Sequence, residues 1–280
     1  MASIESLEGV TLHSCKTPMG TQELAWLLAK SVWTLNVLAS AFVVWRLYAA
    51  GLHRIYRFFF ASLILALLRS AALLPFSPRL STYYRIWAGT EPILWLSYVL
   101  VVFELYSLVL KRYRGIYTVG RMFFFTAVAV STIISALTVL PTMTGALATH
   151  PLLHYYALIE RAVVTSLAIF LLLLLMLVTW FPVPLSRNLL IHCSVYSAYF
   201  FAGNVITLLW HIGGAEANYW TNMARFAVAM ACYCSWAFLL SRSGEDRTAA
   251  LHLGRSPMEE KRLLGQLEGL NATLLRTARK

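Results

Sequence analysis

The segment Tyr84–Arg114 constrains the fold of this chain more than any other. It is apolar and long enough to cross a bilayer, yet it contains Glu91 and Glu104. A carboxylate surrounded by hydrocarbon costs several kcal/mol, so acidic side chains of membrane helices usually face other helices and find partners there. The segment therefore predicts a membrane helix whose acidic residues point into a helical bundle.

The composition supports a membrane protein. The 280-residue chain is 59% hydrophobic and only 12% charged, whereas about a quarter of the residues are charged in soluble domains. The net charge is +11, but Lys and Arg cluster at the ends of the apolar runs. We therefore assign the basic character to membrane topology and expect membrane lipids, but no nucleic acid, as partners.

The apolar runs predict an all-α membrane protein, a bundle of seven transmembrane helices. Each run holds roughly twenty or more residues, which suits a bilayer core of about 30 Å. The predicted spans are residues 23–45, 58–76, 86–110, 122–140, 152–180, 189–212 and 219–240. The chain then divides into an extracytoplasmic segment 1–22, a transmembrane domain 23–241 and a cytoplasmic tail 242–280.

The distribution of Lys and Arg predicts the orientation. The loops after the first, third and fifth spans and the segment after the seventh carry most of these cations: Arg46, Arg54, Arg57, Lys111, Arg112, Arg114, Arg121, Arg187, Arg242, Arg247 and Arg255. The opposite side has only Lys16, Arg79 and Arg85. Because cytoplasmic loops carry the excess of Lys and Arg, we expect the N-terminus outside and the C-terminus in the cytosol of a plasma (inner) membrane.

The tail predicts an amphipathic helix over residues 257–278. Leu263, Leu267, Leu270 and Leu274 recur at helical spacing, flanked by basic residues. Three interpretations remain open. The helix lies on the anionic inner leaflet, pairs with a cytoplasmic protein partner, or packs under its own bundle.

Charged side chains from six predicted spans fall at a similar depth, in the outer half of the membrane. They are Lys30, Arg69, Glu91, Glu160, Arg161, His211 and Arg225. Helical spacing places Asn222 on the same face as Arg225, and Asn204 on the same face as His211. In a ring of helices, these residues would converge on a cavity that opens to the outside.

The charges in this layer do not balance. Four Lys and Arg side chains stand against two Glu side chains, and a buried cation without a partner is costly. We therefore expect an anion at this layer, a small ligand or a lipid headgroup, because the planar fork of Arg suits carboxylates and phosphates. The alternatives are ion pairing within the bundle and long side chains that extend to the interface.

Glu104 lies thirteen residues beyond Glu91, roughly 20 Å along a helix and on a different face. It is either hydrogen-bonded to a neighbouring helix or titrates protons in a transporter or switch. The sequence contains no HExxH, GxSxG or Walker motif. The histidines scatter in depth, so we expect no cofactor and no bound metal.

Three classes of function fit these features. The first is a receptor-like or sensor-like protein that binds an anion outside and signals through a separate partner at residues 257–278. The second is a proton-coupled transporter of a small anion or lipid, with Glu104 as the proton carrier. The third and weakest is a lipid enzyme that uses Glu91 or Glu160 as acid or base.

Overall fold

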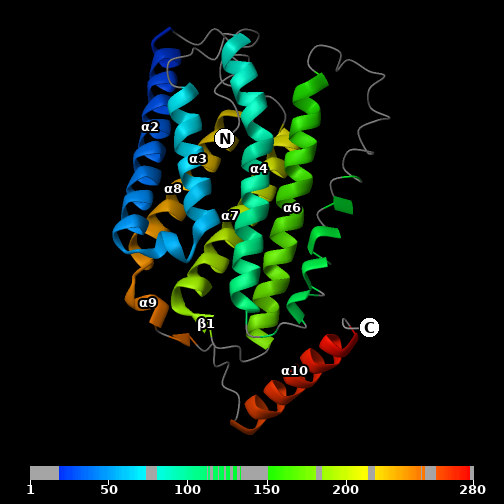
Figure 1. Cartoon of the computed structure of the whole chain (residues 1–280). Helices are drawn as coiled ribbons and strands as arrows, with labels where there is room; N and C mark the ends of the chain where they lie inside the picture. Colours follow the sequence, from blue (N-terminus) through cyan, green and yellow to red (C-terminus); the bar gives the residue numbers. More distant parts are fainter. Residues whose placement is uncertain are drawn as a thin grey trace. The chain divides into compact units, whose positions relative to one another are not determined.

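The computed structural model describes residues 19–73, 81–111, 151–180, 185–213, 218–246, 248–249 and 257–277, with short pieces between residues 113 and 133. Nearly all of these residues are helical (Figure 1). The predicted span 122–140 falls largely outside them. The chain divides into two compact units, Met1–Val101 with Phe201–Leu240 and Val102–Phe200 with Ser241–Lys280. Each unit is described by itself.

The first unit is built around α2. Its elements are α2 (Met19–Ala49), η1 (Leu52–Arg54), α3 (Arg57–Leu73), the first part of α4 (Ser81–Val109), the last part of α7 (Arg187–Gly213), and α8 (Asn218–Leu239). Helix α2 packs against both α3 and α8. It is followed by Gly51, which has a φ of 71°. Glycine adopts this left-handed conformation without strain and turns the chain toward α3.

The face that α2 turns to its neighbours is partly polar. Asn36, Ser40, Val43 and Leu47 recur at steps of four, three and four and are buried. The opposite face is apolar and exposed, and includes Leu38. This arrangement reverses that of a helix in a soluble protein, where the apolar stripe faces the core.

Arg46 links the end of α2 to the end of α8. Its Nη2 donates a hydrogen bond to the carbonyl oxygen of Leu240, at 3.2 Å. The last carbonyls of a helix have no partner within the helix and carry partial negative charge, so a cation there is favourable. Helices α3 and α8 are also in contact, since the ring centroids of Phe59 on α3 and Trp236 on α8 lie 4.9 Å apart. Arg46 therefore has a structural contact in addition to its predicted effect on topology.

The second unit holds the remaining parts of α4 and α7. It also contains α6 (Pro151–Trp180), β1 (Leu185–Ser186), α9 (Ser243–Asp246), β2 (Thr248–Ala249) and α10 (Pro257–Thr277). The two short strands pair antiparallel, with Leu185 opposite Ala249. An aromatic contact also lies in this unit: the ring centroids of Phe124 and of Phe170 on α6 are 4.4 Å apart.

The predicted tail helix is present as α10, and one of its four regularly spaced leucines is buried. Leu267 is 1% exposed. The side-chain oxygen Oδ1 of Asn271, one turn further along, accepts a hydrogen bond from the backbone N–H of Ile116 at 3.4 Å. Of the three interpretations of the tail, packing against its own chain is the one that these contacts match.

Four helices of the described residues are long and apolar enough to cross a membrane, over Lys30–Ala49, Arg85–Val109, Ile159–Trp180 and Arg187–Leu209. Their large exposed side chains include many apolar ones, and a minority of their buried side chains are polar or charged, such as Glu91 and Glu104. Both observations fit a membrane protein. The described part of α3 has 17 residues, and neither α3 nor α8 is among these four helices. The number of seven spans therefore stays a prediction.

Candidate functional site

Polar residues that share a helical face in the sequence are buried in the structure. On α3, Ser62 and Arg69 are both buried, seven residues apart. On α8, Asn222, Cys232 and Trp236 are buried as well. Since lipid is the poorest environment for polar groups, these faces are the ones that contact protein. Arg225, on the same predicted face of α8, is half-buried, so the burial agrees with the helical spacing only in part.

Arg69 and Glu91 form an ion pair between α3 and α4. Nη2 of Arg69 donates a hydrogen bond to Oε2 of Glu91. The two side chains are 1% and 7% exposed. Each charge alone would be very costly at this burial, and removing one partner of such a pair typically costs about 3–5 kcal/mol. The pair therefore holds α3 and α4 together at this level.

Glu91 does not use the full hydrogen-bonding capacity of Arg69. Nε and Nη1 of Arg69 are buried, and neither has a hydrogen-bond partner within the described part of the chain. The guanidinium carbon Cζ lies 6.0 Å from the centre of the Trp87 ring, which is at the limit of a cation–π contact. Arg69 thus presents two buried donors that suit the oxygens of an anion or of water.

Arg225 makes a different contact. Its Nη2 donates to Oγ1 of Thr207 at 2.9 Å, which links α8 to the last part of α7. The Thr207 hydroxyl in turn donates to the carbonyl oxygen of Gly203 at 2.8 Å. Asn222, one turn before Arg225, is buried, and Asn204 is half-buried. These residues supply further polar groups in the first unit.

The remaining predicted site residues lie in several environments. Lys30 and Arg161 are exposed, so the structure does not place them in the buried group. Glu160 is half-buried, and both it and Arg161 belong to the second unit. The side chain of His211 lies outside the described residues. Their long stems let Lys and Arg reach the interface from a membrane helix, which is the alternative that the sequence left open.

Glu104 is buried in the apolar part of α4 and is 8% exposed. It lies in the second unit, whereas Glu91 lies in the first. Among the described residues, no group of three or more His, Cys, Asp or Glu side chains is arranged to hold a metal ion.

A polar cluster at the start of α7 was not predicted from the sequence. Asn188 is 0% exposed, and its Nδ2 donates to the carbonyl oxygen of Ser241 at 2.7 Å and to Oε2 of Glu245 at 2.9 Å. Ser186 donates to Oε1 of the same Glu245 carboxylate at 3.2 Å. Its hydroxyl also accepts from the backbone N–H of Leu189, as an N-cap residue does. The cluster ties the start of α7 to the segment that follows α8.

Gly244 is required by this cluster. A Cβ at this position would collide with Oδ1 of Asn188 and lie 3.1 Å from its Cγ. The backbone N–H of Gly244 also donates to Oγ of Ser241 at 3.1 Å. The signals for this site in the sequence are an Asn at the start of a span and Ser-Gly-Glu-Asp after another. Neither shows that the two segments meet, because they are separated by more than fifty residues.

Comparisons with family models, with curated proteins and with solved structures gave no match to this chain.

We predict that Gly244→Ala lowers the free energy of unfolding by about 1–3 kcal/mol, because the added methyl group displaces the Asn188 side chain and leaves its buried partners unsatisfied. Thermal unfolding in detergent measures the loss. Gly265→Ala is the control, since a Cβ at that exposed position in α10 meets nothing within 4 Å.

In an Asn188→Ala background, the same Gly244→Ala change should cost much less, because the displaced side chain is already absent. Equal losses in both backgrounds would show that Gly244 acts through something other than Asn188.

Proposed function

We propose that this chain is a receptor-like or sensor-like membrane protein that binds a small anionic ligand or a lipid headgroup through Arg69. The observation that carries the proposal is the pair of buried donors, Nε and Nη1, that Arg69 keeps after pairing with Glu91. A buried guanidinium with unused donors is stabilised when an anion supplies oxygen atoms in its plane.

The proposed topology places this site on the outer side. It has seven spans, with the N-terminus outside and the C-terminus in the cytosol. Lys and Arg support this orientation, because Arg46 lies in the last turn of α2, Arg54 and Arg57 come shortly after it, and all three are at the end of α2 away from Lys30. Glu91 follows the start of α4 by ten residues, which puts the Arg69–Glu91 pair nearer to the proposed outer end.

The signal would leave through a separate partner. Helix α10 offers its exposed face, which includes Arg262, Gln266 and Thr273, for contact with a cytoplasmic protein, while the face with Leu267 packs on this chain.

A proton-coupled transporter is the second candidate. It is favoured by Glu104, a buried carboxyl inside the apolar window of α4, because buried carboxyls within membrane spans commonly relay protons. Uptake of labelled phosphate by liposomes that contain the purified protein separates the candidates, since a sensor moves no ion. Uptake driven by a pH gradient and lost in Glu104→Gln would favour the transporter.

We predict that phosphate or succinate raises the melting temperature of the detergent-solubilised protein above its value in chloride at equal ionic strength. Binding to the folded state alone adds about 2.7 kcal/mol to its stability when the free anion reaches 100 times Kd. Arg69→Met should abolish this rise, whereas Arg57→Met, which removes an exposed arginine from the same helix, should leave it unchanged.

Glu91→Gln keeps an acceptor for Arg69 but removes the competing negative charge. We expect this variant to melt at a lower temperature without anion and to bind the anion more tightly than the parent. If phosphate and succinate shift the melting of the parent and of Arg69→Met equally, Arg69 is not an anion site and the pair is purely structural.

A further inference from the structure

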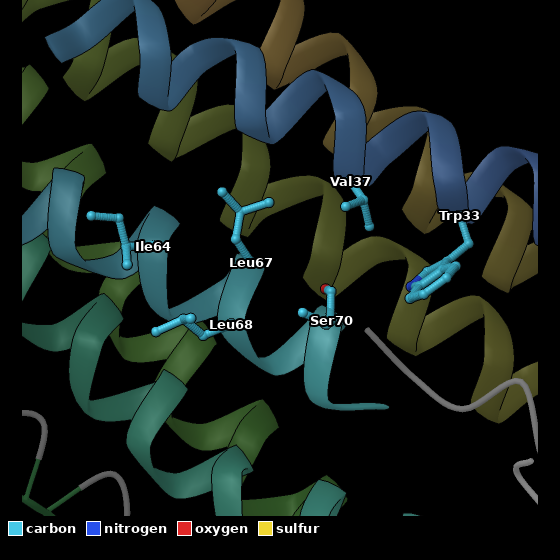
Figure 2. Close-up of a pocket in the computed structure, with 7 residues that line it drawn as sticks. Trp33, Val37, Ile64, Leu67, Leu68 and Ser70 are labelled. Atoms are coloured by element: carbon cyan, nitrogen blue, oxygen red, sulfur yellow. The ribbon is translucent and has the colours of Figure 1, made fainter. Parts of the chain in front are cut away.

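A pocket of about 410 Å³ lies between α2 and α3, and its lining includes Leu68 and Ser70, the two sequence neighbours of Arg69. Figure 2 shows Trp33 and Val37 of α2 on one side and Ile64, Leu67, Leu68 and Ser70 of α3 on the other. Its volume is within the range of about 300–1,000 Å³ that is typical of ligand sites. The Ser70 hydroxyl already donates to the carbonyl oxygen of Ala66 at 2.9 Å. The lining therefore suits a hydrocarbon and not a polar molecule.

The pocket lies in a stretch that we assign to the membrane. Trp33 and Val37 belong to the apolar window Lys30–Ala49. Leu68 of the lining is 63% exposed, and Leu38, which follows Val37 in the sequence, is 61% exposed. In a membrane, a pocket in such a surface is in contact with acyl chains and not with water. Hydrocarbon fills it readily, because an empty hollow loses the dispersion contacts that its lining would otherwise make.

A cation lies one helical turn before Trp33, a residue of the pocket lining, on α2. Lys30 is exposed and begins the apolar window of α2. It precedes Trp33 by three residues and Val37 by seven, so all three lie on one face of the helix. The rise from Lys30 to Trp33 is about 4.5 Å. Trp and Lys at the end of an apolar window are typical of the level of the lipid headgroups.

We propose that this pocket, which forms a groove between α2 and α3, holds one acyl chain of an anionic phospholipid whose phosphate pairs with Lys30. The groove supplies the apolar contact, Trp33 borders it near the interface, and Lys30 supplies the charge that selects the headgroup. The assignment does not depend on the anion site at Arg69, whose side chain is 1% exposed and paired with Glu91.

Native mass spectrometry of the full chain released from lipid nanodiscs tests the proposal. The nanodiscs contain equal amounts of phosphatidylglycerol and phosphatidylcholine. We expect the parent to retain one tightly bound phosphatidylglycerol. Val37→Trp fills the groove and should lose this lipid, whereas Leu208→Trp, which adds the same ring at an exposed position on α7, should keep it.

Lys30→Gln tests the headgroup contact separately and, since Lys30 is exposed, leaves the fold intact. We expect the preference for phosphatidylglycerol over phosphatidylcholine to fall about fivefold. Lys111→Gln removes another exposed lysine and should leave the preference unchanged.

Retention of the same lipid by Val37→Trp, or an unchanged preference in Lys30→Gln, would overturn the proposal. Equal retention of both lipids by the parent would overturn it as well. Arg69→Met should retain the lipid as the parent does, so failure of the anion site and failure of the lipid site give different results.

Discussion

The ion pair between Arg69 and Glu91 is the constraint on which the first unit depends. Two opposite charges that are almost fully buried must stay together, because separation leaves each in a medium that cannot solvate it. The pair therefore fixes which faces of α3 and α4 meet. Pro92 follows Glu91 directly within α4, and its ring removes one backbone hydrogen bond of the helix. Polar groups at this level thus come from both side chains and backbone.

Elsewhere in the unit, several polar side chains are buried beside the apolar core, while many large apolar side chains are exposed. Asn36 and Ser40 of α2 and Asn222 of α8 are buried, while Leu38 and Trp220 are exposed. Hydrocarbon accepts the exposed side chains, and the neighbouring helices or a bound molecule accept the buried ones. This division suits two ligands of different chemistry. An anion suits the interior at Arg69, and an acyl chain suits the outer groove between α2 and α3.

Much of this arrangement can be predicted from the sequence, because it depends on the helical spacing of polar residues and on the small number of charged residues in the apolar segments. The spacing of Ser62 and Arg69 predicts their shared burial, and the rarity of charge in an apolar run predicts that Glu91 faces inward. The sequence left the exposure of Lys30 and Arg161 open as an alternative, because depth along a helix does not say where a long flexible side chain extends.

The Asn188 cluster could not be predicted from the sequence, for a different reason. Its partners Ser241 and Glu245 lie beyond the end of α8, and only the folded chain brings them to the start of α7. Likewise, the leucine spacing of α10 predicts a helix with an apolar face but does not identify what covers it. The contact of Asn271 with the backbone of Ile116 is set by tertiary packing.

Exchange of the two charges tests the central claim most directly. Arg69→Glu and Glu91→Arg should each lower the free energy of unfolding by about 3–5 kcal/mol, since each places two like charges together in the interior. The double variant restores an opposite pair, and we expect it to recover most of that loss in thermal unfolding of the purified protein in detergent. A double variant that loses as much stability as the two single variants combined would show that Arg69 and Glu91 do not meet, and would contradict the account given above.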